Sequence, residues 1–575
     1  MKQRIHVQNH KKTERIYEPV ENVLELIDHI KGFGDRTLFL WNGRTKNDPD
    51  GVMTYAEFAE EVAAVAAAID KEGLRGERIA VIGANSHMWV GAYLGTVASD
   101  SVIVPLDKEL SEESIAGFMQ TVDATTIFYD VGMTKTICAV AEKNDFIKHL
   151  ICMGATEPGD GVRTFSFEQW LEIGKQALAD GYTYPPVTDV RKMCEMLFTS
   201  GTTGTSKCVM LCQENIFSVV TCADETVDFS PDDRVLSVLP MHHTYELACM
   251  LALLNYGASC AINDSITHVL ANLKKYRPTT LVVVPLYVST FYKRIWNEAK
   301  NKKKDKVLRY GIKASNALLA FGIDIRKKLF DSVTSAFGGN LKKMICGGAA
   351  LNPALVHTFE SFGISIYEGF GITECAPLTN VTPYYNRKPG SVGPAVPCCT
   401  VRIAENGDIN EDGYAEGEIQ VKGKNVMLGY YKNEEATRDA FTEDGWFRTG
   451  DVGYMDEEGF LYITGRLKSV IVLDNGKNVF PEEIEEYLEG IEQIAECVVV
   501  GRKDADGVTK LYVLIYPAAD FSAERSYEEM QKFFEEEISK INHKLPTFKQ
   551  ISFVELRDKE FEKTSSRKIR RHLVK

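Results

Sequence analysis

Short apolar runs alternate with helix-like stretches through the first two thirds of the chain, and this alternation constrains the fold more than any other feature. The apolar runs are typical of buried strands and occupy residues 78–82, 125–129, 280–284 and 344–346. Helical periodicity separates them, for example over residues 56–69 and 111–118. Strands that are apolar on both faces and alternate with helices form parallel sheets covered by helices. The sequence therefore predicts an α/β fold.

The pattern changes in the last third of the chain. Residues 401–463 contain short strands punctuated by glycine and aspartate, with a hairpin expected at residues 456–459. This texture predicts a smaller β-rich subdomain.

After Arg466 the chain becomes more highly charged and reads as α+β. Pro481 begins one expected helix, and Ser526 with Glu529 forms the capping box of another. A chain of 575 residues also exceeds the ~250 to 300 residues at which a single core stops growing. We predict a large N-terminal domain over residues 1–465 and a small, mobile α+β domain over residues 466–575.

Charge and composition exclude several functional classes. The net charge of -15 argues against general nucleic-acid binding, which needs a basic face. The most apolar window, residues 247–262, is shorter than the ~20 residues of a membrane-spanning helix, and no secretory signal follows residues 1–7. Thirteen cysteines without a C-x-x-C pair fit reduced thiols better than disulfides or a zinc site. We expect a cytoplasmic protein without a transmembrane segment.

Residues 199–207 form a polar run between two expected strands, residues 196–198 and 209–211. The run holds six hydroxyl side chains, two glycines and Lys207, a composition suited to wrapping polyphosphate oxygens. It lacks the Gly-Lys-Ser/Thr triplet and the following helix of the usual P-loop. The run alone is compatible with a polar surface turn or with an ATP-binding loop.

Seven segments in chain order resemble motifs of the adenylate-forming superfamily, which includes acyl-CoA synthetases, firefly luciferases and the adenylation domains of peptide synthetases. They are residues 199–207, 239–243, 347–349, 370–374, 448–451, 465–468 and 563–568. The first is similar to T-S-G-T-T-G-x-P-K-G, with Ser206 and Cys208 in place of the Pro and the last Gly. The last is similar to K-T-x-x-G-K, with Arg567 in place of the Gly. The resemblance implies an AMP-forming acyl-CoA ligase, closest to long-chain fatty acid ligases.

The resemblance further implies ATP, Mg²⁺ and CoA as cofactors and assigns roles residue by residue. Catalytic roles fall to Lys568, His243 and Thr373, and Glu374 would hold the magnesium ion. The implied cofactor-binding positions are Thr199, Ser200, Gly201, Thr202, Thr203, Gly204, Lys207, Gly347, Gly348, Ala349, Glu368, Gly369, Phe370, Gly371, Asp451, Arg466, Lys468 and Gly476. Among these, Lys468 is implied as the hinge between two domain orientations, and Gly476 as a neighbour of the pantetheine arm of CoA.

Residue chemistry agrees with these roles but leaves alternatives. Two acceptor oxygens on Asp451 match the paired hydroxyls of a ribose, although an aspartate in a β-turn would look the same. A hard carboxylate such as Glu374 suits Mg²⁺. His243 is compatible with an acyl-pocket wall or with a core histidine, and residues 475–478 with a CoA contact or with a polar hairpin.

The segment after His243 bears on the acid. Glu246 lies three positions on, as in long-chain acyl-CoA synthetases, and no aspartate occurs between Pro240 and Asn263 to hold an α-ammonium group. A fatty acid is therefore favoured over an amino acid. Two alternatives stay open: transfer of the acyl group to a separate acyl carrier protein, and a nucleotide- or acyl-binding protein that has lost turnover.

Residues 300–306 are the densest basic stretch, with five lysines. Such a run is usually a solvated face. It could instead attract the 3′-phosphate of CoA or an anionic membrane surface. In the second case the protein would contact the membrane peripherally.

Overall fold

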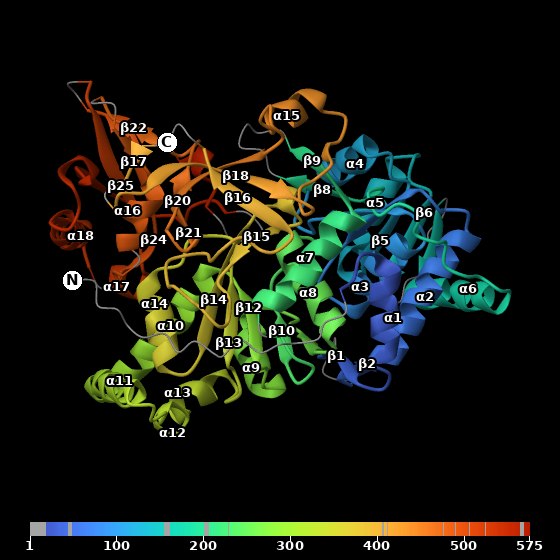
Figure 1. The fold of residues 1–575 in the computed structure, drawn as a ribbon, viewed down its shortest axis with the longest axis horizontal. Coiled ribbons are helices and arrows are strands. Elements are labelled where there is room, and N and C mark those ends of the chain that lie inside the picture. Colours follow the sequence, from blue (N-terminus) through green and yellow to red (C-terminus); the bar gives the residue numbers. More distant parts are fainter. Residues whose placement is uncertain are drawn as a thin grey trace.

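The structure is a computed structural model of the 575-residue chain. It describes residues 19–43, 49–154, 162–199, 206–227, 229–404, 408–410, 412–474, 477–488, 490–504, 507–523, 525–563 and 569–574. Two large sheets, a β-rich sheet and a C-terminal α+β unit make up the molecule (Figure 1).

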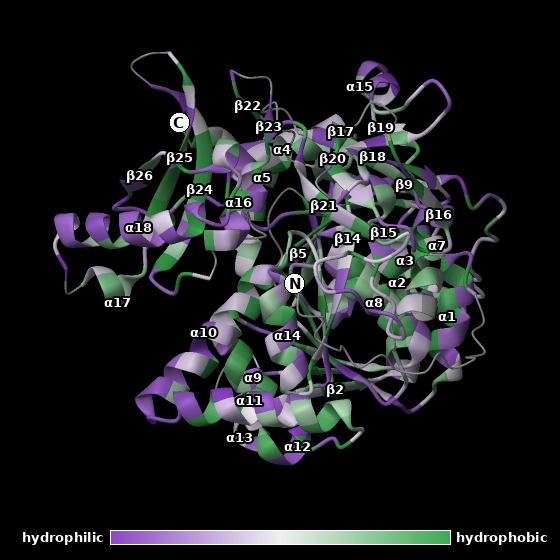
Figure 2. Cartoon of the chain, turned by 60° about the vertical axis from the view of Figure 1, so that its left-hand side comes forward, coloured by the Kyte–Doolittle hydropathy of each residue, from purple (hydrophilic) through white to green (hydrophobic). Residues whose placement is uncertain are grey.

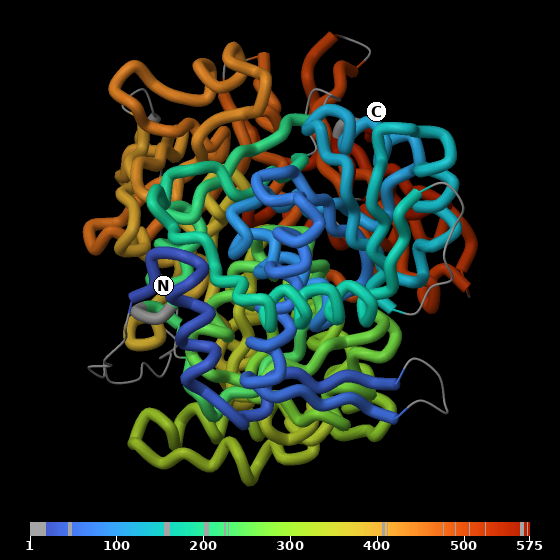
Figure 3. The backbone as a smooth tube through the Cα atoms, turned by 90° about the vertical axis from the view of Figure 1, so that its right-hand side faces the viewer, coloured from blue at the N-terminus to red at the C-terminus, as the bar shows by residue number. Residues whose placement is uncertain are grey.

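The first large sheet has eight strands in the order β15-β14-β13-β12-β10-β11-β1-β2. Their bounds are Leu378–Val381, Ser365–Gly371, Lys343–Cys346, Thr280–Val283, Arg234–Ser237, Ser259–Ile262, Thr37–Trp41 and Gly51–Thr54. Strands β14 through β1 run parallel, and the antiparallel strands β15 and β2 close the two edges. Strands β1 and β2 lie side by side at one edge (Figure 3). The carboxyl ends of the parallel strands therefore share one edge of the sheet.

The second large sheet also has eight strands, in the order β19-β9-β8-β4-β3-β5-β6-β7. Their bounds are Gly429–Tyr430, Lys207–Cys212, Met193–Thr199, Val102–Leu106, Arg78–Ile82, Thr126–Asp130, His149–Met153 and Arg163–Ser166. Strands β8 and β9 are antiparallel, with Phe198 opposite Cys208, so the strand pair predicted around the polar run is confirmed.

Helices cover these sheets and fill the space between them. Those associated with the two sheets are α1 (Val23–Gly32), α2 (Tyr55–Lys71), α3 (His87–Ala98), α4 (Glu112–Thr121), α5 (Thr134–Glu142), α6 (Phe167–Ala179), α7 (Gln213–Thr226), α8 (Thr244–Tyr256), α9 (Val269–Tyr276), α10 (Pro285–Asn301) and α14 (Pro353–Ser361). Helices α3 and α8 are buried around almost their whole circumference. One apolar core contains residues of both sheets, such as Phe39 and Val235 of the first and Ile79 and Leu197 of the second. The predicted α/β class is confirmed.

The predicted β-rich subdomain is a five-stranded antiparallel sheet. Its strands are β16 (Cys399–Ile403), β17 (Asp408–Ile409), β18 (Ala415–Gly423), β20 (Phe447–Met455) and β21 (Leu461–Arg466). Helix α15 (Glu434–Asp439) precedes β20. Phe370 at the end of β14 packs with Ile419 and Leu461, which attaches this sheet to the first large sheet.

The C-terminal unit has its own apolar core. It comprises β22 (Ile471–Val472), β23 (Asn478–Val479), α16 (Pro481–Leu488), β24 (Ile494–Lys503), β25 (Thr509–Pro517), α17 (Ala519–Ser522), α18 (Tyr527–Asn542) and β26 (Phe553–Leu556). The helix starting at Pro481 and the capping box of Ser526 and Glu529 are both confirmed. Figure 2 shows α18, β24 and β25 together on one side of the molecule.

Polar contacts join this unit to the rest of the chain. Lys293 of α10 donates to the carbonyl of Ile494 at 3.0 Å, and Asn352 donates to the carbonyl of Glu486 at 3.4 Å. Lys300 forms an ion pair with Glu492. The domain boundary at residues 465 and 466 stays a prediction.

Candidate active site

Three of the predicted site segments lie at the carboxyl-terminal edge of the first sheet. His243 follows β10, Gly347 follows β13, and Gly369 to Glu374 end β14 and enter the short 3₁₀ turn Thr373–Cys375. Because β10, β12, β13 and β14 are parallel neighbours, their carboxyl ends meet at this edge. Ligands of open α/β sheets bind at such an edge.

Close backbone approach explains the glycine at position 347. A Cβ atom on Gly347 would lie 3.2 Å from the ring of Tyr245 and 3.4 Å from the carbonyl oxygen of Gly369. The Tyr245 hydroxyl donates to the carbonyl of Ile345 at 2.9 Å. Gly348 adopts the left-handed region, with φ of 86°. Tyr245, two residues after His243, thus packs against the turn at Gly347, and Gly369 of β14 lies beside that turn; the sequence motifs did not reveal this contact.

Tyr430 connects the polar-run strand to Glu374. Its hydroxyl donates to Glu374 Oε1 at 2.9 Å, and the Lys207 ammonium lies 4.6 Å from its ring centroid. Burial, and secondarily the Glu374 carboxylate, raise the pKa of Tyr430 well above its usual value, so the phenol stays a donor. The Met427 N–H donates to the Glu374 carbonyl at 2.8 Å and fixes the turn. Glu374 is 56 positions from Tyr430, so no local sequence spacing could have identified this pair.

His243 caps the start of α8 beside a second imidazole. The rings of His242 and His243 lie 4.3 Å apart, and His242 Nε2 is 3.6 Å from a carboxylate oxygen of Asp107. The His243 N–H donates to the carbonyl of Pro240 at 3.2 Å, which shapes the turn before the helix.

Glu246, in the first turn of α8, is 2% exposed and accepts a short hydrogen bond from the Ser237 hydroxyl. Burial raises the pKa of Glu246 to about 8, so this side chain is mainly a neutral carboxylic acid near pH 7. Asn85 donates to Ser237 Oγ at 3.1 Å and accepts from the Met241 N–H at 3.1 Å. The buried network therefore anchors the segment that carries His242 and His243.

Asp451 and Arg466 face each other on the β-rich sheet. They are register partners on β20 and β21, and Arg466 Nε lies 2.8 Å from Asp451 Oδ1. The aspartate side chain is 5% exposed and the arginine side chain 53% exposed. Asp451 N–H donates to Thr449 Oγ1 at 3.0 Å. The two predicted nucleotide contacts thus form one ion pair, and the Thr449 hydroxyl holds the backbone of the aspartate.

Two other predicted nucleotide positions have side chains engaged in packing. Glu368 is buried and accepts from the Gly390 N–H at 3.1 Å, and burial raises its pKa to about 8. Phe370 lies in the small cluster with Ile419 and Leu461. Contacts to a nucleotide at these positions would come from backbone groups. Gly371 lies so close to Pro377 that a Cβ atom would be 2.0 Å from its carbonyl oxygen.

The predicted hinge follows the last strand of the β-rich sheet. Lys468 is exposed, and the turn around it is tied down by Leu467 N–H donating to the Gly450 carbonyl at 2.9 Å. Gly465 packs against the Phe480 ring, where a Cβ atom would approach to 2.6 Å. Lys468 thus lies between the β-rich sheet and the C-terminal unit, and its role as a hinge stays a prediction.

Several predicted site residues lie outside the described residues. They are Ser200, Gly201, Thr202, Thr203, Gly204, Gly476 and Lys568, and their roles stay predictions. The ends of the polar run are described: Thr199 pairs with Lys207 across β8 and β9.

Glu374 is the residue that would hold a magnesium ion in this site. In the described part of the chain, no group of three His, Cys, Asp or Glu side chains is arranged to hold a metal ion. A Mg²⁺ ion that accompanies nucleotide phosphates needs only one or two protein carboxylates, with phosphates and water completing its shell. Glu374 alone therefore fits the donor set expected for such an ion.

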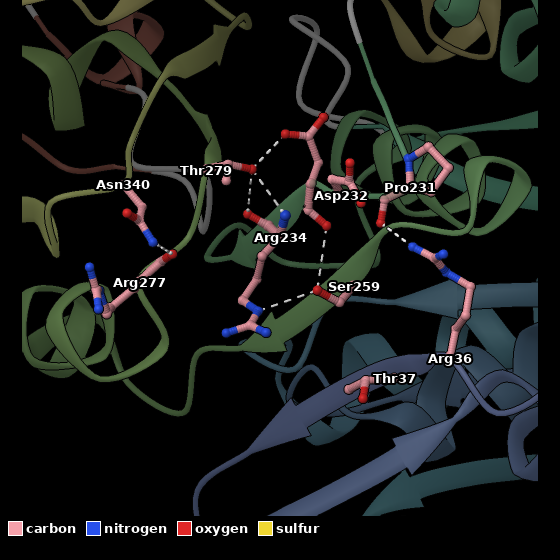
Figure 4. A pocket seen from close by; sticks show the side chains of 10 residues that line it. Arg36, Thr37, Pro231, Asp232, Arg234, Ser259, Arg277, Thr279 and Asn340 are labelled. Carbon is pink, nitrogen blue, oxygen red and sulfur yellow. Dashed lines mark hydrogen bonds between the residues drawn. The ribbon is translucent and has the colours of Figure 1, made fainter.

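A polar cavity of about 370 Å³ lies at the opposite edge of the first sheet (Figure 4). Arg234 and Ser259 on its wall begin β10 and β11. Arg36 donates to the Pro231 carbonyl at 2.6 Å, and Arg234 Nε donates to Ser259 Oγ at 3.3 Å (Figure 4). These bonds join chain segments, and the cavity is separate from the edge that carries Gly347 and Glu374.

Comparison with known proteins agrees with this geometry. The model of the family "AMP-binding enzyme" matches residues 27–431, and that of the "AMP-binding enzyme C-terminal domain" matches residues 468–575. The chain belongs to the AMP-binding enzyme family. Its predicted resemblance to the adenylate-forming superfamily is thereby confirmed.

Curated relatives of this AMP-binding enzyme carry acyl-CoA ligase names. Long-chain-fatty-acid--CoA ligase 1 of Homo sapiens is 30% identical over 487 residues, covering 80% of this chain and 69% of the relative. Long-chain-fatty-acid--CoA ligase FadD15 of Mycobacterium tuberculosis is 29% identical over 500 residues, covering 82% and 79%.

Solved structures show the same fold at lower identity. The adenylation domain of a carboxylate reductase from Mycobacterium chelonae has a TM-score of 0.78 at 19% identity, covering 96% of this chain and 89% of that one. The anthranilate CoA ligase AuaEII with anthranoyl-AMP has a TM-score of 0.74 at 18% identity, covering 97% and 96%. None of the helices in the described ranges has the length and apolar character needed to cross a bilayer.

Proposed function

We propose that this AMP-binding enzyme is an AMP-forming acyl-CoA ligase that acts on fatty acids. The observation that carries the proposal is the linked set of Lys207, Tyr430 and Glu374 beside the carboxyl ends of β13 and β14. It brings a cation, a hydrogen-bond donor and a carboxylate to one edge, as a polyphosphate with a bound cation requires. The ligase names of the relatives support the same conclusion.

In the first half-reaction, a carboxylate oxygen of the acid attacks the α-phosphorus of ATP, and pyrophosphate leaves. Both reactants are anionic, so positive charge must lie between them. Lys207 stands at the end of the polar run, and we assign Lys568 to bridge the carboxylate and the α-phosphate. Asp451 would accept from the ribose hydroxyls, oriented by Arg466. Mg²⁺ held by Glu374 would neutralise phosphate charge.

In the second half-reaction, the thiol of CoA attacks the acyl carbon, the bond from that carbon to the phosphate oxygen breaks, and AMP leaves. Adenylation and thioester formation would use one site in two orientations of residues 466–575. Lys468 is the proposed pivot, and Gly476 would approach the pantetheine arm.

The state of Glu246 supports a fatty acid over an amino acid. Glu246 is buried and accepts from the Ser237 hydroxyl, and burial raises its pKa to about 8, so the acyl segment, which the structure describes in full, offers no exposed carboxylate as a counter-ion for an α-ammonium group. The acyl segment also lacks an aspartate that could take that role.

A pyrophosphate-release assay over a panel of acids, with and without CoA, tests the proposal. Medium and long alkyl acids should exceed acetate and α-amino acids by well over tenfold in kcat/KM, because each buried CH₂ contributes roughly 0.8 kcal/mol. Equal activity with acetate or an amino acid would reject the fatty acid. Pyrophosphate release without any acyl-CoA product would instead favour a carrier-protein acceptor.

A further inference from the structure

Helix α11 (Asp305–Ala320), which follows the basic run, presents apolar side chains to solvent. Val307 is 67% exposed, Tyr310 71%, and Phe321, the residue that ends the helix, 84%. Ala314 and Ala317 are also exposed. These positions follow one another by three or four residues, so they share one face of the helix.

The opposite face of α11 already packs on the protein. Leu308 and Ile312 contact the main core, and Ser315 is buried. The helix is thus apolar on two faces, of which only one is covered. The exposed stripe continues past α11 through Ile323 and Leu329, which ends α12 (Arg326–Leu329).

Exposed apolar side chains are concentrated in this part of the chain. Among described residues, seventeen large hydrophobic side chains are exposed, and five of them lie between Val307 and Leu329. Figures 1 and 2 both place α11, α12 and α13 (Asp331–Thr334) at the periphery of the molecule. A cluster of this kind marks an interaction surface more often than scattered single residues do.

Cations flank the stripe on a protein whose overall charge is -15. Six lysines beside the stripe are exposed, and among the described residues no carboxylate lies within ion-pair distance of them. They are Lys303, Lys304, Lys306, Lys313, Lys327 and Lys328. Nearby Lys300 and Lys302 are ion-paired with Glu492 and Glu298. The surface therefore combines unpaired positive charge with apolar side chains.

We propose that α11 and α12 form a docking surface for an anionic lipid bilayer. A helix that lies in the membrane interface places apolar side chains among acyl chains while its cations meet anionic headgroups. The 3′-phosphate of CoA would use the lysines but not the apolar stripe. A second copy related by a twofold axis would bring the same lysines against each other, which is unfavourable. The inference does not depend on which acid the enzyme activates.

Vesicle flotation with the full-length protein tests this surface. Binding should be clear with vesicles of phosphatidylcholine containing phosphatidylserine, and weak with phosphatidylcholine alone. It should weaken as salt rises, because the Debye length falls from about 8 Å at 0.15 M to about 3 Å at 1 M. Equal binding to both vesicle types would overturn the proposal.

Two sets of substitutions separate charge from apolar contact. Exchanging Lys303, Lys304 and Lys306 for Glu should weaken binding to anionic vesicles at least about tenfold, since each cation near such a surface contributes measurably. Phe321→Ser combined with Ile323→Ser should weaken binding similarly but change its salt dependence less. Thermal unfolding and activity on a water-soluble short acid should stay at wild-type values in both.

Matched controls lie elsewhere on the surface. Exchanging the exposed Lys135, Lys148 and Lys175 for Glu gives the same change in net charge, and Val52→Ser with Tyr527→Ser removes exposed apolar side chains of other elements. Both controls should float like wild type. Loss of binding in the controls, or wild-type binding in the test variants, would overturn the proposal. A raised KM for CoA in the lysine variant with unchanged flotation would assign the lysines to CoA, and a dimer that dissociates in the Phe321 variant would assign the stripe to a second copy.

Discussion

Tyr430 contacts two predicted site residues through different parts of its side chain: its hydroxyl donates to Glu374, and its ring lies beside the Lys207 ammonium. The motifs identify Lys207 and Glu374 separately, but the side chain that contacts both comes from β19, a two-residue strand at the edge of the second sheet. The Tyr430 N–H donates to Thr437 Oγ1 at 2.9 Å, which fixes β19 beside β9. Whether a side chain from an edge strand reaches the site depends on the order of the strands in the sheet, and no local spacing in the sequence encodes that order.

Tyr430→Phe removes that hydroxyl and keeps the ring beside Lys207. A hydrogen bond to a charged group contributes about 1.5 to 3 kcal/mol, so kcat/KM for pyrophosphate release should fall roughly 10- to 100-fold. The melting temperature should change little, because the ring still packs.

Tyr431→Phe is the matched control. Its hydroxyl donates to the exposed Asp123 at 3.3 Å, away from Glu374. Activity should stay near wild type. A similar loss in both variants would show that the Tyr430 hydroxyl has no special part in the reaction.

At the scale of elements, individual strands and helices followed from local pattern. The apolar run at 78–82 forms β3, the run at 280–284 contains β12, and the turn at 456–459 joins β20 to β21. The order of strands in each sheet did not follow, because β1 pairs with β11, more than 200 residues along the chain. The buried network under α8 was equally hidden, since Asn85 comes from the loop before α3, 152 positions from the Ser237 hydroxyl that it contacts.

Glu246 makes the anchoring of α8 sensitive to pH. Its pKa rises from 4.5 to about 8 on folding, so the folded protein keeps a proton that the unfolded chain loses between these values. The free energy of unfolding should therefore fall as pH rises through this window. Glu246→Gln removes this titration. Between pH 5 and pH 8 the free energy of unfolding should therefore fall less in the variant than in the wild type, and the difference between the two should be a few kcal/mol at most.

Chemical denaturation at several pH values measures this slope. Glu195→Gln should also flatten it, because burial raises the pKa of Glu195 on β8 to about 8 as well. An unchanged slope in the Glu246 variant would mean that the carboxyl is ionised in the folded protein.

At the scale of the whole molecule, the two proposed half-reactions require residues 466–575 to take two orientations. Lys568→Ala should abolish formation of acyl-AMP but leave thioester formation from supplied acyl-AMP and CoA largely intact. Lys468→Pro should do the reverse, because a stiffened hinge lets acyl-AMP form but blocks the rotation. Half-reactions measured separately distinguish the two.

Lys563→Ala is the control for the loss of a C-terminal cation. Lys563 is ion-paired with Glu496 and Glu560, so it is already engaged within the C-terminal unit. Its loss should spare the first half-reaction. Equal loss of both half-reactions in the Lys568 and Lys468 variants would argue against a rotating domain.

The central claim is that a carboxylate oxygen of the acid becomes bonded to the α-phosphorus of ATP. A fatty acid labelled with ¹⁸O in its carboxylate tests this directly, with mass spectrometry of the products formed in the presence of ATP and CoA. We expect one ¹⁸O atom in AMP, one in acyl-CoA, and none in pyrophosphate. Labelled inorganic phosphate together with ADP, or AMP without the label, would contradict it.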